Sequence, residues 1–260
     1  MPIPQMITDR YQRLRAWFAQ SAQVADVLYE LPANVADVRI LCFSPNAPVN
    51  MGIAAGQANN ALYVPAVSRG QLLAFTTQRF MNEYNLDYPG PPLEYPMPEY
   101  RLFEEGPHYY LPVIFVRLQQ QWMDNLQDAD VNFLSAMVPL HELGHALLGA
   151  ADAQHQGESY AYWIELKTIL HFIRTTVPIG GNYDAPAVGI TTSAQAIAGF
   201  VTGRENQYAI AKNPAERAVR NTGLPNTIDQ IANVLQAAGL PQAGVAGLTQ
   251  EATRLRQMPP

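Results

Sequence analysis

The sequence predicts an α+β fold that combines a small mixed β-sheet, two long helices and a helical C-terminal part. Three runs rich in β-branched or aromatic residues lie between residues 37 and 118, and apolar residues at helical spacing recur from residue 128 onward. With 260 residues, 48% of them apolar, the chain can bury a large core. We expect one domain over residues 1–176 and a linker with a helical subdomain over 177–260, which can also belong to the same domain.

The first half of the chain alternates helix and strand patterns. An amphipathic pattern behind Thr8 or Asp9 predicts a helix over about 8–31, and the segment 70–84 is also helical in character. Three runs rich in β-branched or aromatic residues predict strands: "DVRILCFS" from Asp37, "NALYVPAV" from Asn60 and "YYLPVIFVRL" from Tyr109. Each run is bounded by Pro, Gly or Asn. Between the second and third runs, the prolines of residues 85–107 exclude helix and favour extended backbone, either as a surface excursion or as a rim over a substrate cleft.

Two helices are predicted after the strands. The first begins at a cap provided by Asp128 or Asp130 and passes through Pro139, which predicts a kink or a late start. The second runs from about Glu158 to Arg174. Beyond them, helical pieces are expected near Ser193, Asn213, Thr227 and Leu248.

Charge and cysteine content exclude several classes of partner. The net charge is -6 and basic residues do not cluster, so we expect neither nucleic acid nor a membrane surface as a partner. The single cysteine, Cys42, excludes an intramolecular disulfide framework and fits a reducing compartment. No signal-peptide pattern or long apolar span occurs, which predicts a cytoplasmic protein or one exported without a standard signal.

The segment "VPLHELGHALLG" carries the pattern H-E-x-x-H at His141, Glu142 and His145. Positions four apart share one face of a helix, so the two imidazoles can converge on one metal ion. Glu142 is rotated by about 100° and stands beside the open position of such an ion, where a carboxylate can deprotonate the metal-activated water. Two imidazoles with one carboxylate suit Zn²⁺. Chance would produce this pattern in a chain of this composition about once in 200 to 300 cases.

"HELGHALLG" resembles the zincin metallopeptidases, whose active-site helix supplies two zinc histidines and the general base. The resemblance is strong over about 35 residues and looser over the order of strands and helices. It implies a zincin-like domain and zinc-dependent hydrolysis of protein or peptide substrates, with Glu142 as the general base.

The third zinc ligand distinguishes the subfamilies. A metzincin would place glycine at 148 and a ligand at 151, where this chain has Leu148 and Ala151. Asp152 and His155 are weaker candidates for the third ligand. Their alternative roles are a helix cap for Asp152 and a loop residue for His155. A gluzincin takes a glutamate from the next helix, and Glu158 and Glu165 both qualify.

Glu165 stands 20 residues after His145, which resembles the thermolysin arrangement, but Thr168 and Ile169 follow where those enzymes carry a small residue and an aspartate. Glu158 is followed by Ala161, similar to the E-x-x-A pattern of compact gluzincins in which alanine allows the two helices to approach. A first helix ending at Gly149 favours Glu158, and a turn extending to Gly157 favours Glu165. We predict Glu158 as the ligand, and expect the other glutamate to orient a histidine.

Two further functions remain open. A non-catalytic zinc-stabilised binding module would need a closed site of four ligands and would give Glu142 no role. A metal hydrolase of a non-protein amide, such as a deformylase, would need a cysteine ligand, and Cys42 lacks the glycine-flanked setting of that family. If the protein is a peptidase, His108, Tyr109 and Tyr110 are candidates for stabilising the oxyanion of the tetrahedral intermediate. Their alternative role is packing as aromatic residues of a strand.

Overall fold

The computed structural model describes residues 128–148, 158–186 and 189–260, together with Arg13, residues 121, 124 and 125, and the short strands given below. In this part of the chain the fold is α+β, as predicted. Of the expected N-terminal helix only Arg13 is described, and it is helical. The expected helix over 70–84 lies outside the described residues, as does most of the proline-rich segment 85–107.

The central sheet has three strands in the order β1-β9-β5. Strand β1 (Arg39–Phe43) pairs with β9 (Val113–Arg117) in parallel, and β5 (Ala61–Val64) pairs with β9 in antiparallel orientation. The first two predicted strands are therefore confirmed. The third is confirmed over Val113–Arg117, but its first predicted residues form a separate strand, β8 (Tyr109–Tyr110), which pairs instead with β7 (Glu104–Glu105). Pro112 lies at the break, and proline cannot donate a ladder hydrogen bond.

Two further pairs of very short strands precede β9. Strand β2 (Asn50–Met51) pairs with β6 (Leu86–Asp87), and β3 (Ile53–Ala54) pairs with β4 (Gln57–Ala58). Strands β6 and β7 fall at the two ends of the proline-rich segment, where the sequence predicts extended backbone.

Helix α7 (Ala129–Leu148) carries the H-E-x-x-H pattern and lies across β5 and β9. Its start is capped as predicted, because the Asp128 carboxylate accepts the backbone N–H of Val131 at 2.9 Å. The helix begins ten residues before Pro139 and continues through it, so the proline does not delay the start. Phe133, Leu140 and Leu143 are fully buried, which explains why a helix of this length is held against the sheet.

Helix α9 (Glu158–Thr175) crosses α7 at a point where both helices carry small residues. A Cβ atom built on Gly144 would stand 3.1 Å from the Cα and the carbonyl oxygen of Ala161. Ala161 is fully buried, so neither helix has room for a larger side chain there. The close approach that the sequence predicted for Ala161 is therefore observed, with Gly144 as its partner.

Replacing Gly144 by valine is expected to destabilise the protein by about 1–3 kcal/mol, because backbone atoms of α9 would have to move. Gly199 is a matched control, since it lies inside helix α10 (Ala194–Thr202) with no atom within 4 Å of a built Cβ. Gly199→Ala should stabilise the protein by about 0.5–1 kcal/mol through helix propensity. Urea unfolding of both variants measures the difference; equal stability of Gly144→Val and the parent would show that the crossing is not tight.

The C-terminal part begins with a hairpin that the sequence did not predict, formed by β10 (Asn182–Ala185) and β11 (Ile190–Ser193). The expected helical pieces follow, and Ser193 and Asn213 cap α10 and α12 with their side chains. The remaining elements are α11 (Glu205–Tyr208), α12 (Pro214–Ala218), the π-helix η2 (Val219–Gly223), α13 (Leu224–Ala237) and α14 (Gln242–Arg256).

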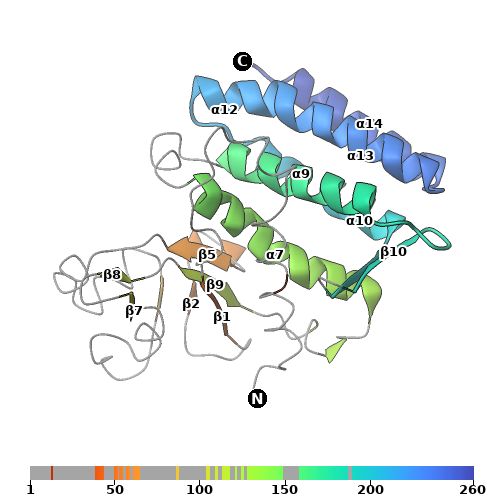
Figure 1. The fold of residues 1–260 in the computed structure, drawn as a ribbon. Helices are drawn as coiled ribbons and strands as arrows, with labels where there is room; N and C mark the ends of the chain where they lie inside the picture. The colour runs from red at the N-terminus through yellow and green to blue at the C-terminus, as the bar shows by residue number, and fades with distance from the viewer. Residues whose placement is uncertain are drawn as a thin grey trace.

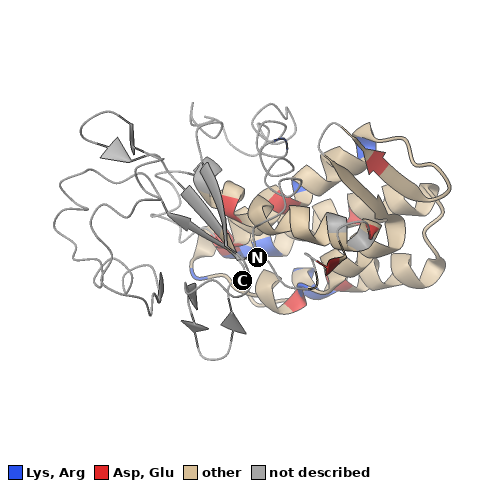
Figure 2. Ribbon diagram, turned by 90° about the horizontal axis from the view of Figure 1, so that it is seen from below, with Lys and Arg blue, Asp and Glu red and all other residues tan. Residues whose placement is uncertain are grey.

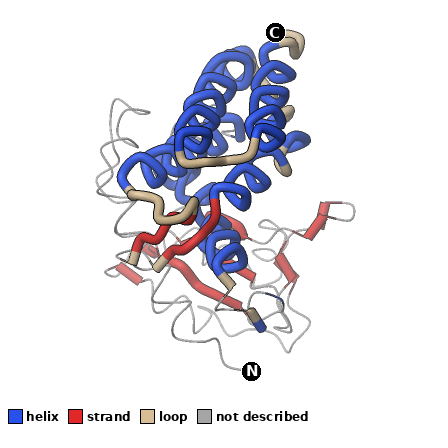
Figure 3. The backbone as a smooth tube through the Cα atoms, turned by 90° about the vertical axis from the view of Figure 1, so that its right-hand side faces the viewer, coloured by secondary structure: helices blue, strands red, loops and turns tan. Residues whose placement is uncertain are grey.

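The helices form layers on one side of the sheet (Figure 1): α7 lies on the strands, α9 packs on α7, α13 covers α9, and α14 packs on α13 and α10. The tube in Figure 3 shows the same separation of described helices from strands. One continuous apolar core joins α7, α9 and the C-terminal helices. In the described residues, basic and acidic positions are interspersed along the ribbon (Figure 2), and none of the helices is both long and apolar enough to cross a membrane.

Candidate metal centre

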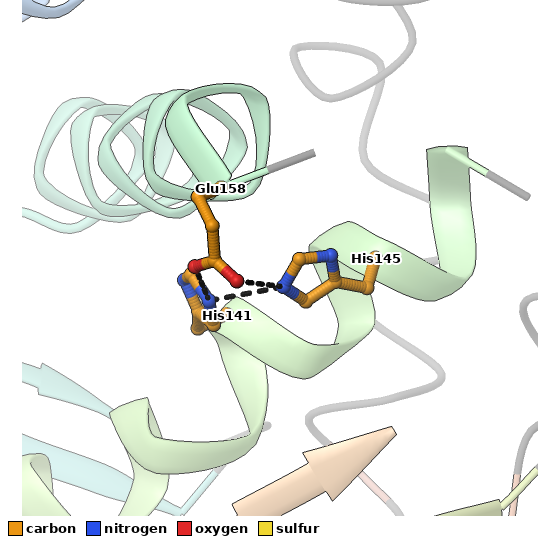
Figure 4. Close-up of side chains that lie close together, drawn as sticks. All are labelled: His141, His145 and Glu158. Atoms are coloured by element: carbon orange, nitrogen blue, oxygen red, sulfur yellow. Dashed lines mark hydrogen bonds and ion pairs between the residues drawn. The ribbon is translucent and has the colours of Figure 1, made fainter. Parts of the chain in front are cut away.

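Three side chains from two helices meet where α7 and α9 cross (Figure 4). His141 and His145 stand one turn apart on the same face of α7, and their Nε2 atoms are 3.1 Å apart. Glu158, the first residue of α9, points between the two rings. Its carboxylate oxygens lie 3.4 Å from Nε2 of His141 and 3.9 Å from Nε2 of His145.

This group fits a divalent metal ion. Ligand atoms at the usual zinc distances and tetrahedral angles are about 3.3 Å apart, close to the separations of the three side chains. Donor atoms of His141, His145 and Glu158 all lie within 4.8 Å of one another. Two imidazole nitrogens and a carboxylate suit zinc, but nickel, cobalt and iron accept the same donors. The arrangement therefore supports metal binding without selecting one metal.

The Glu158 carboxylate is held in the ionised form that a metal requires. Burial by itself would raise its pKa, but the hydrogen bond with His141 and the charges of His141, His145 and Lys212 outweigh burial. Together they lower the pKa of Glu158 to about 2. Its side chain is 32% exposed, so the carboxylate stands at the edge of the buried core.

Glu165 has a different environment from Glu158, although both lie on one face of α9. Its side chain is fully buried, and Oε2 lies 3.7 Å from Nδ1 of His141, the ring nitrogen that does not face Glu158. Burial raises the pKa of Glu165, and the positive charges of Arg204 and His141 oppose that rise. Glu165 thus stands behind His141, where a carboxylate orients an imidazole rather than sharing its ligand atom.

Glu142 is half-buried on α7, next to His141 in the chain. Its charge is close enough to act on Tyr162 and Glu165: burial is the main cause that raises the pKa of Tyr162, with contributions from Glu165, Glu158 and Glu142. The general base predicted from the sequence therefore belongs to the same electrostatic neighbourhood as the His-His-Glu group.

Two residues near the histidines were not assigned to the site from the sequence. Tyr162 places its ring centroid 4.2 Å from that of His141. Its spacing was an available signal, because Tyr162 lies four residues after Glu158 and three before Glu165. Arg204 lies 3.4 Å from Glu165 through Nη1, and no local pattern in the sequence points to it.

The other candidates from the sequence have different outcomes. Asp152, His155 and His108 lie outside the described residues, as do Gly149 and Gly157, on which the argument from turn length depends. Tyr109 and Tyr110 form β8, which pairs with β7 outside the three-stranded sheet.

Comparisons of the chain with protein-family models, with curated proteins and with solved structures find no match.

Proposed function

We propose that the protein is a zinc metalloendopeptidase of the gluzincin type, with a zincin-like catalytic domain. The observation that carries the proposal is the meeting of His141, His145 and Glu158 at the crossing of two helices, with Glu142 beside them in the H-E-x-x-H pattern. The substrate class is a protein or peptide.

In this proposal His141, His145 and Glu158 hold the zinc ion. A zinc ion held there would polarise the scissile carbonyl and lower the pKa of the attacking water. Glu142 accepts the proton of that water and later delivers it to the leaving amine. Tyr162 packs against the His141 ring and restricts its rotation.

Two observations favour this proposal over a structural zinc site. Structural sites are closed by four protein ligands, and the described residues bring three metal-binding side chains together here. The H-E-x-x-H pattern also places Glu142 next to the first of the two histidines, and hydrolysis requires a base beside the open position. A deformylase-like amide hydrolase would need a cysteine ligand, whereas the single cysteine, Cys42, lies in β1 within the sheet.

The experiment is cleavage of a broad peptide library by the zinc-loaded protein. We expect internal peptide bonds to be cut, activity to disappear after a chelator removes the metal, and stoichiometric zinc to restore it. The library is analysed by mass spectrometry, which locates each cut. If the zinc-loaded protein never cuts the library while remaining folded, the binding-module alternative replaces the peptidase proposal.

A further inference from the structure

Arg204 lies in the connection between α10 and α11, in the C-terminal part of the chain. Its guanidinium Nη1 is 3.4 Å from Oε2 of Glu165, and its plane lies over the ring of Phe200 at 4.3 Å and near that of Tyr162 at 5.8 Å. The side chain is 22% exposed, so most of it is buried among these groups.

We propose that Arg204 is a positioning residue of the metal centre, acting through Glu165 on His141. It holds the Glu165 carboxylate against Nδ1 of His141, so that Nε2 is the nitrogen presented to His145 and Glu158. The inference rests on the proposed metal site, but its first readout is the state of His141 in the metal-free protein.

The buried carboxylate requires a cationic partner to stay in place. Neither oxygen of Glu165 has a hydrogen-bond partner, and the two groups at ion-pair distance among the described residues are Arg204 and His141. An uncompensated carboxylate in a core is costly. Arg204 therefore provides the fixed charge that determines where the Glu165 side chain lies.

The position of that carboxylate affects which tautomer His141 adopts. Nδ1 of His141 is also buried without a hydrogen-bond partner, and Glu165 lies on its side of the ring at 3.7 Å. A negative charge there favours a proton on Nδ1, because the N–H dipole then points at the carboxylate, whereas Glu158, 3.4 Å from Nε2, favours a proton on Nε2 in the metal-free protein. Glu165 thereby shifts the equilibrium toward the form whose lone pair is on Nε2, the nitrogen that faces His145 and Glu158.

The packing of Arg204 connects the C-terminal helices to the metal centre. Helix α10 carries Phe200, which forms an edge-on contact with Phe133 of α7 at 5.5 Å between ring centroids, and it also packs against α14. The guanidinium lies on the Phe200 ring at the end of this helix. Folding of the C-terminal part thus places the charge that Glu165 needs.

The test compares Arg204→Met with Arg204→Lys in the full chain. Methionine keeps an apolar stem and removes the charge, and lysine keeps the charge without the planar fork. Arg254→Met is the matched control, because Arg254 makes 2.7 Å contacts with both oxygens of buried Glu251 in α14. Three quantities are measured: the His141 tautomer by nitrogen NMR of the metal-free protein, the zinc Kd by chelator competition, and the Tm.

We expect Arg204→Met to shift the His141 tautomer equilibrium away from the Nδ1–H form and to weaken zinc binding by about 10 to 100-fold. Arg204→Lys should recover part of both effects, and Arg254→Met should lower the Tm without changing either. If Arg204→Met does not fold, Arg204→Gln serves in its place.

An unchanged tautomer or an unchanged zinc Kd in a folded, uncharged variant overturns the proposal. Retention of zinc by His141→Ala would instead refute the metal site. The His141 tautomer in the metal-free parent and Arg204 variants would then still show whether Arg204 acts on His141.

Discussion

Replacing Glu142 by glutamine is expected to slow peptide hydrolysis by about 100 to 10,000-fold. Glutamine has nearly the same shape as glutamate but cannot accept the proton of the attacking water. The two histidines and Glu158 are untouched, so zinc content and Tm should remain those of the parent. Zinc content, Tm and kcat are measured on the same preparations.

Glu205→Gln is the control for the loss of one negative charge, because Glu205 is exposed on α11 and is not part of the His-His-Glu group. It should keep full activity. If a verified substrate is cut equally well by Glu142→Gln and by the parent, Glu142 is not the general base. Loss of zinc from Glu142→Gln would mean that this residue belongs to the metal site itself.

The second large effect concerns the ligands. Replacing Glu158 by glutamine is expected to weaken zinc binding by more than about 100-fold, beyond the range typical for groups that only orient a ligand. The reason is the loss of the charged donor that faces both Nε2 atoms at 3.4 and 3.9 Å. The zinc Kd is measured by competition with a chelator.

Glu165→Gln provides the comparison for Glu158→Gln, because the two glutamates share a face of α9 and only one of them faces both histidines. We expect Glu165→Gln to weaken zinc binding by about 10 to 100-fold, less than Glu158→Gln. The reverse order would show that Glu165 is the ligand and that the spacing from His145 was the better guide.

Local patterns predicted the elements that surround the site. Strands β1 and β5 are short runs of β-branched and apolar residues, and α7 and α9 have long apolar stripes with an aspartate cap before the first. Such signals lie within a few residues of the element they specify. The α+β class followed from their order.

The errors have physical causes as well. Tyr109–Arg117 matches the pattern of one apolar strand, but Pro112 falls within it in the sequence, and Tyr109 pairs with Glu105 instead of entering the three-stranded sheet. The hairpin of β10 and β11 was missed because its strands are short and mostly polar. Its connection depends on Gly189, whose φ of 69° is a turn conformation rather than a strand signal.

In the candidate site, too, only the residues that lie close together in the sequence were predicted by local spacing. His141 and His145 lie about one helical turn apart, so their spacing alone predicted a shared face, with Glu142 rotated by about 100° beside them. Glu158 and Glu165 also share a face, and the packing of α9 on α7, which is close at Ala161 and Gly144, brings the first of them opposite the histidines. Arg204 comes from a distant segment, and its place depends on the folding of α10 against the core.

Elemental analysis of the purified chain tests the metal centre most directly, with the parent compared against a His141→Ala, His145→Ala double variant prepared without added metal. We predict one zinc per chain in the parent and almost none in the folded double variant, because two of its three proposed ligands are gone. Full zinc occupancy in the double variant, or a parent that binds no divalent metal when zinc is supplied, would contradict the His-His-Glu site.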